Sequence, residues 1–132
     1  MKASTRYGLV GIGALSLLSL AHWLRETVTW RQPASAYFLG VTPNFAAAIA
    51  ISFVLLSIWA DQRPGASFPI SARAFLVCTS ISGLGLLGWE LVQKTSSRFV
   101  FDPHDVGATL VGICIATLLF YILTPRLGGG SR

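Results

Sequence analysis

The sequence predicts an all-α integral membrane protein, a bundle of four transmembrane helices with both ends of the chain in the cytoplasm. Hydrophobic residues make up 53% of the 132 residues and charged residues only 11%, and the apolar residues are gathered into four long blocks. A soluble domain carries roughly 25% charged residues, so this composition excludes an ordinary water-exposed surface. By length the chain is one domain, which we place at residues 1–124, and a flexible glycine-rich tail follows at 125–132.

Each apolar block is long enough to cross a bilayer. The blocks cover residues 7–24, 43–60, 70–93 and 103–123. A helix over residues 7–24 reaches about 27 Å, close to the thickness of the hydrocarbon core of a membrane. This first block follows two basic residues and ends in small ones, as a signal peptide does, but we interpret it as the first spanning helix.

Helix start and stop signals support these limits. Thr42 and Asp102 each precede a proline, so we expect each side chain to cap the N-terminus of the helix that follows. A polar turn at residues 61–65 separates the second and third blocks, and Pro125 ends the fourth.

The basic residues set the predicted orientation. With the N-terminus inside, the cytoplasmic side holds the larger share of them, as the positive-inside rule requires. The inner set is Lys2, Arg6, Arg63, Arg73, Arg126 and Arg132, and the outer set is Arg25, Arg31, Lys94 and Arg98. Because these residues are scattered between apolar blocks, we interpret the net charge of +5 as a topology signal and expect no binding of nucleic acid. The expected surroundings are the lipid bilayer of the cell inner membrane.

Small residues recur at intervals of one helical turn on two of the blocks. One row consists of Ala108, Gly112 and Ala116, and the other of Ala46 and Ala50. Small residues allow close approach of helices in lipid, where the hydrophobic drive between helices is weak. We expect these rows to be contact faces within the bundle, with Gly112 near the contact between the third and fourth helices. A dimer contact is the alternative use.

Polar residues at the outer ends of the third and fourth blocks form the candidate site. If those blocks make an antiparallel hairpin, their ends and the loop between them converge in one pocket, and the loop arginine can bond both carboxylates. An ionisable residue in apolar surroundings is costly and is a functional candidate for that reason. The pocket residues are Glu90, Gln93, Arg98, Asp105 and Thr109.

The alternative account of these charges is structural. Asp102 and Asp105 stand where acidic residues favour the start of a helix. Glu90 stands four residues before Lys94, in the order that favours an ion pair along a helix.

The sequence contains no pattern typical of a metal site, a cofactor site or a nucleophile. Cys78 and Cys114 fall within apolar blocks, and His22 and His104 lie near the outer face without a haem attachment motif. We therefore expect no metal and no cofactor, and we assign no catalytic residue.

The segment over roughly residues 85–123 resembles the VanZ-like family of small bacterial membrane proteins. That family carries a glutamate and a glutamine three apart, an arginine in a short loop, and an aspartate followed by a small polar residue and a glycine. The matching positions are Glu90, Gln93, Arg98, Asp105, Thr109 and Gly112. The chain departs from the pattern at Trp89, where the family has a second acid, and at Thr109, where it has asparagine. At residues 43–45 it also lacks the family's basic residue and histidine.

The resemblance implies a small protein of the bacterial cell envelope, and named members of the family are linked to glycopeptide-antibiotic resistance. Our first hypothesis is a non-enzymatic protein that binds an amphiphile or a partner protein through the outer polar pocket and the small-residue helix faces. The alternatives are an accessory subunit of a larger membrane protein complex, and a membrane-embedded enzyme that acts on a lipid-linked envelope substrate with Glu90 or Asp105 as acid or base.

Overall fold

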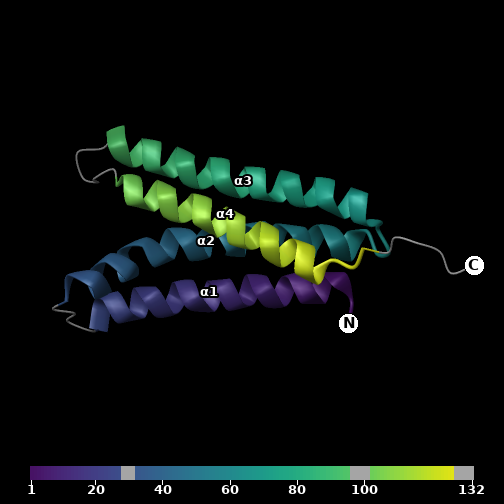
Figure 1. Cartoon of the computed structure of the whole chain (residues 1–132), viewed down its shortest axis with the longest axis horizontal. Coiled ribbons are helices and arrows are strands. Elements are labelled where there is room, and N and C mark those ends of the chain that lie inside the picture. Colours follow the sequence, from purple (N-terminus) through teal and green to yellow (C-terminus); the bar gives the residue numbers. More distant parts are fainter. Residues whose placement is uncertain (28–31, 96–101, 127–132) are drawn as a thin grey trace, which may run out of the picture.

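The computed structural model folds the chain into four helices that run side by side (Figure 1). It describes residues 1–27, 32–95 and 102–126. The helices are α1 (Ala3–Thr27), α2 (Pro33–Gln62), α3 (Phe68–Thr95) and α4 (Pro103–Leu123), and the described residues include no strand. All four are long and apolar enough to cross a membrane. The prediction of an all-helical chain with four candidate spans is therefore confirmed.

The second helix begins much earlier than the sequence predicts, at Pro33 instead of residue 43. Pro43 lies inside α2, where it leaves the carbonyl of Leu39 without the usual backbone donor, and the helix bends along its length in Figure 1. Prolines are tolerated in membrane helices because side-chain hydroxyls and neighbouring helices satisfy the freed backbone groups. The prediction that Thr42 caps a helix is therefore wrong: its hydroxyl donates to the Phe38 carbonyl of the same helix, at 2.6 Å.

α2 forms the centre of the bundle and packs against each of the other three helices. Contact between α3 and α4 is much less extensive than the contact of α4 with α2. Residues of both predicted small-residue rows lie in the interior of the bundle, since Ala46, Ala50 and Ala116 are almost completely buried. Gly112 also faces α2, next to Phe45 and Ala48, so its predicted position at the contact between the third and fourth helices is wrong. Ala108 is only partly buried.

Aromatic rings fill the core in the half of the bundle nearest the two termini. The rings of Phe75 on α3 and Phe120 on α4 are stacked, with centroids 4.4 Å apart and planes inclined by 8°. Tyr7 on α1 packs against Phe53 and Phe120, and its hydroxyl shares a hydrogen bond of 2.8 Å with the hydroxyl of Thr124. This contact ties the start of α1 to the residue that follows α4.

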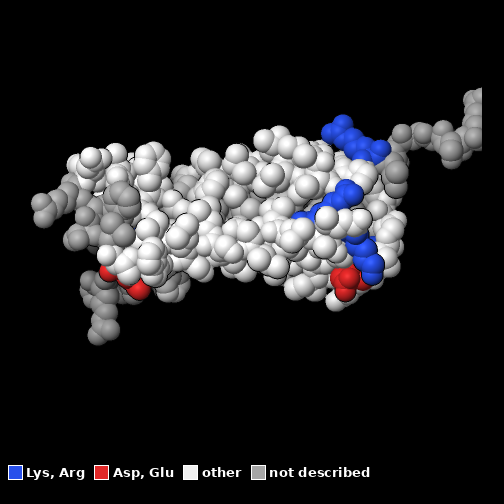
Figure 2. Space-filling view, turned by 90° about the horizontal axis from the view of Figure 1, so that it is seen from below, with Lys and Arg blue, Asp and Glu red and all other residues white. Residues whose placement is uncertain are grey.

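The two ends of the bundle carry different charges. We name the end that holds both termini the basic end, because its described residues include five basic side chains and one acid: Lys2, Arg6, Arg63, Arg73, Arg126 and Asp61. We name the other end the acidic end, where the described charges are Arg25, Lys94, Glu26, Glu90, Asp102 and Asp105. On the face shown in Figure 2 the basic side chains gather at the end that carries the termini.

Candidate functional site

Glu90 is a buried carboxylate near the end of α3, with only 3% of its surface exposed. Its Oε1 accepts a hydrogen bond of 3.4 Å from Nδ2 of Asn44, at the long end of the range for such bonds. Its Oε2 is buried and has no hydrogen-bond partner among the described residues. A buried carboxylate oxygen without a donor is costly, so a hydrogen-bond donor or a cation at this position would stabilise Glu90.

Asn44 brings three helices together at this point. It stands directly after Pro43 on α2, and its side chain lies beside the Asp105 carboxylate of α4 as well as that of Glu90. Asp105 is near enough to Glu90 for their negative charges to repel each other. We name Asn44, Glu90 and Asp105 the polar cluster. Two acids held together in partly apolar surroundings favour a proton, a cation or a strong hydrogen-bond donor between them.

A groove of about 530 Å³ opens beside Asp105 at the acidic end. Its wall comes from α1, α2 and the start of α4. Arg25 on α1 supplies a positive charge that attracts Asp105, so the groove offers both signs of charge to a ligand. The lining residues are Arg25, Ala36, Tyr37, Gly40, Val41, Asp102 and Asp105.

Two further contacts stabilise the N-terminus of α4. Asp102 is the N-cap, as the sequence predicts, and its side chain accepts a hydrogen bond of 2.9 Å from the backbone N–H of His104. The hydroxyl of Tyr37 and Nδ1 of His104 share a hydrogen bond of 3.1 Å, and their rings meet edge to face. These contacts fix the first turn of α4, and with it the position of Asp105.

The structure brings together part of the predicted pocket. Glu90 and Asp105 are neighbours, but Gln93 is half-buried and makes no side-chain hydrogen bond within the described part of the chain. The Thr109 side chain is buried, and its hydroxyl donates to the backbone carbonyl of Asp105 at 3.0 Å, so the helix itself satisfies it. Arg98 lies outside the described residues.

Three residues of this site were missed by the sequence analysis, namely Asn44, Tyr37 and Arg25. Because the second helix was expected to start at residue 43, Asn44 was placed in a first turn, and Tyr37 was left outside the helix. One signal for Asn44 was present: it is the only amide side chain in the block over residues 43–60. Arg25 reaches the site through the packing of α1 on α2, which composition alone does not reveal.

No group of three or more His, Cys, Asp or Glu side chains that could hold a metal ion occurs in residues 1–27, 32–95 and 102–126.

Comparison with known proteins finds no matching family model, no matching curated protein and no matching solved structure.

Proposed function

We propose that this chain is a small VanZ-like integral membrane protein of the bacterial cell envelope, and that the polar cluster and its groove bind the polar headgroup of an amphiphile. The observation that carries the proposal is the buried Oε2 of Glu90, which lacks a partner among the described residues. A ligand hydroxyl or ammonium group that binds Asp105 in the groove would offset the repulsion between Asp105 and Glu90.

The position of the groove favours an amphiphile over a water-soluble ligand. It lies at the ends of three helices that are long and apolar enough to cross a membrane, and if these helices span a bilayer the groove would lie where the headgroups begin. A headgroup in the groove would meet Asp105 and Arg25, which both line it, so that a cationic and an anionic part of the same ligand would each find an opposite charge.

The basic end belongs in the cytoplasm in this proposal, and the polar cluster belongs on the outer side of the inner membrane. Five basic side chains against one acid at the basic end support this orientation under the positive-inside rule. The cluster would then face substrates and lipids of the cell envelope.

Lipid analysis of the purified protein tests the proposal. The full chain is extracted from bacterial membranes in mild detergent, and the co-purifying lipids are quantified by mass spectrometry for the wild type, Glu90→Gln and Asp105→Asn. We expect one amphiphile to be retained by the wild type in near-stoichiometric amount and depleted several-fold in both variants. Glu26→Gln is the matched control, because it removes an exposed acid at the same end outside the groove. Identical lipid profiles for the wild type and both variants would overturn the proposal.

A further inference from the structure

The basic end carries a second surface with the features of a ligand site, distant from the polar cluster. A cavity of about 380 Å³ lies between the start of α1, the end of α2 and the residues that follow α4. Lys2 and Arg63 supply its positive charges, and the hydrogen-bonded hydroxyls of Tyr7 and Thr124 contribute polar atoms to its wall. Trp59 also lines it, and tryptophan is typical of the membrane–water interface.

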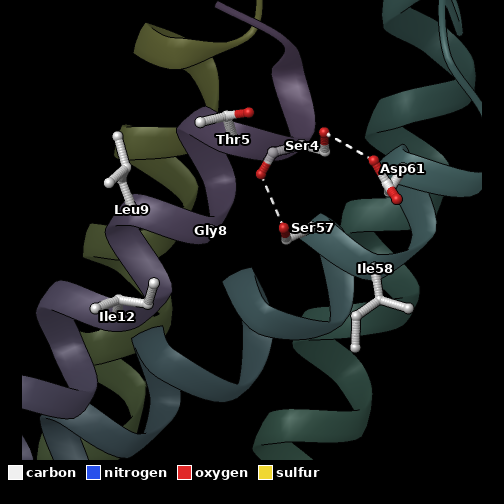
Figure 3. Close-up of a pocket in the computed structure, with 8 residues that line it drawn as sticks. All are labelled: Ser4, Thr5, Gly8, Leu9, Ile12, Ser57, Ile58 and Asp61. Atoms are coloured by element: carbon white, nitrogen blue, oxygen red, sulfur yellow. Dashed lines mark hydrogen bonds between the residues drawn. The ribbon is translucent and has the colours of Figure 1, made fainter.

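A groove continues from this cavity along the outside of α1 and α2 (Figure 3). Ser4 and Asp61 line both depressions, so the two surfaces meet at these residues. At this junction the Ser4 hydroxyl donates to Asp61 at 3.4 Å, and the Ser57 hydroxyl donates to the Ser4 carbonyl at 2.8 Å. The polar end of the groove is therefore built from groups that contact one another across the two helices.

The other end of the groove is apolar and open. Leu9, Ile12 and Ile58 line it, and each is more than half exposed. Gly8 allows α1 to lie close to α2 here, since an added Cβ would lie 3.1 Å from the Ser57 hydroxyl oxygen. Polarity thus falls from a charged cavity to a hydrocarbon-lined groove, in the order of a lipid headgroup followed by its acyl chain.

We infer that this surface binds one anionic glycerophospholipid, with its phosphate at Lys2 and Arg63 and an acyl chain in the groove between α1 and α2. Charge complementarity favours an anion, because the cavity is lined by two basic residues, Lys2 and Arg63, against one acid, Asp61, and the described residues of the basic end add no further acid. Basic pockets between membrane helices bind anionic headgroups by the same electrostatics. The inference is independent of the proposed function and of the orientation of the chain.

Native mass spectrometry of the full chain in mild detergent tests the inference, with phosphatidylglycerol and phosphatidylcholine of identical acyl chains as probes. We expect the wild type to prefer phosphatidylglycerol. Lys2→Gln and Arg63→Gln should each weaken its binding roughly fivefold, and the double variant roughly 30-fold, from the typical attraction of one basic residue for an anionic membrane surface. Both side chains are exposed, and the melting temperature of each variant confirms that it folds.

Arg73→Gln is the matched control, because it removes the same charge at the same end from a residue outside both depressions. We expect it to retain the preference within about twofold. If Arg73→Gln weakens phosphatidylglycerol binding as much as Lys2→Gln or Arg63→Gln, the lipid is attracted by the general charge of the basic end and not by this site. Equal binding of the two lipids by the wild type would also refute the inference. Glycerophosphoglycerol, the headgroup without acyl chains, should bind far more weakly than the lipid. Equal affinity would show a soluble anion site and refute the role of the groove.

Discussion

The backbone of Gly112 on α4 lies against the carbonyl oxygen of Phe45 on α2, so closely that a Cβ added to Gly112 would come within 2.7 Å of that oxygen. The methyl group of Ala48 would lie 2.9 Å from the same Cβ. Contacts below 3 Å do not occur for real Cβ atoms, so the absence of a side chain at Gly112 is what allows α4 to approach the central helix. Phe45 is also the residue after Asn44, so this contact holds α2 and α4 together beside the polar cluster.

Gly112→Ala should therefore destabilise the protein. The added methyl group meets backbone atoms of α2 that cannot rotate away, and overpacking of this kind costs about 1–3 kcal/mol. Thermal unfolding in detergent measures the effect as a lower melting temperature. Gly107→Ala is the control on the same helix, since nothing lies within 4 Å of a Cβ there, and it should leave the melting temperature unchanged or raise it. Equal melting temperatures for the two variants would refute the close contact.

Asn44→Ala should lower the free energy of unfolding by about 1–3 kcal/mol, because it removes the hydrogen bond to Glu90 and leaves the whole buried carboxylate without a partner. The cost should shrink by about 1 kcal/mol in a Glu90→Gln background, where the buried group is neutral. A double-mutant cycle on detergent-solubilised protein measures this coupling. An unchanged cost in both backgrounds would mean that Asn44 does not support Glu90.

The helical class, the four spans and the limits of α4 could be predicted because they depend on local composition and on chain signals such as Asp102 before Pro103. The start of α2 could not be predicted, because the same proline pattern marks either the first turn of a helix or a bend within a membrane helix. The sequence also could not predict which helix each small-residue row contacts. Gly112 would allow close approach of any neighbouring helix, and the structure places it against α2.

The two acids of the site could be predicted from the sequence, whereas the helix that supplies their neighbouring amide could not. Glu90 and Asp105 stand out in the sequence because charges are rare in apolar blocks. Asn44 joins them from a helix 46 residues away from Glu90 in the chain, and a long-range contact of this kind follows from how the helices pack. Thr109 shows the opposite case, since a side chain placed in the pocket by its spacing bonds its own helix instead.

The proposed orientation predicts which ends of the helices can be reached from outside the cell. In a background with Cys78 and Cys114 replaced by alanine, single cysteines are placed at residues 63 and 26, both exposed and at opposite ends of the bundle. A membrane-impermeant maleimide applied to intact spheroplasts should label residue 26 and not residue 63. Both positions should react after the membrane is permeabilised, which is the control for reactivity. Labelling of residue 63 in intact spheroplasts would contradict the proposed orientation and indicate the opposite one.

Arg98, which lies outside the described residues, is the cation that the sequence predicts for the two acids, and as their partner it is the alternative to a ligand. It stands in the connection between α3 and α4, whose ends carry Glu90 and Asp105, and those two charges repel each other. A planar guanidinium can bond two carboxylates at once, so Arg98→Ala should leave both acids without their predicted partner. We expect a loss of about 3 kcal/mol in the free energy of unfolding if the pair is desolvated, since removal of one partner leaves uncompensated buried charge.

The loss in Arg98→Ala should be largely restored in the double variant Arg98→Ala with Glu90→Gln, because the second change removes one of the stranded charges. Chemical unfolding in detergent provides the measurement. Arg31→Ala is the matched control, since it removes the same charge from the other connection on the same predicted side. If Arg98→Ala unfolds like Arg31→Ala, and Glu90→Gln brings no rescue, then Arg98 is not the partner of the acids. The unsatisfied Oε2 of Glu90 would in that case be left for a ligand to fill.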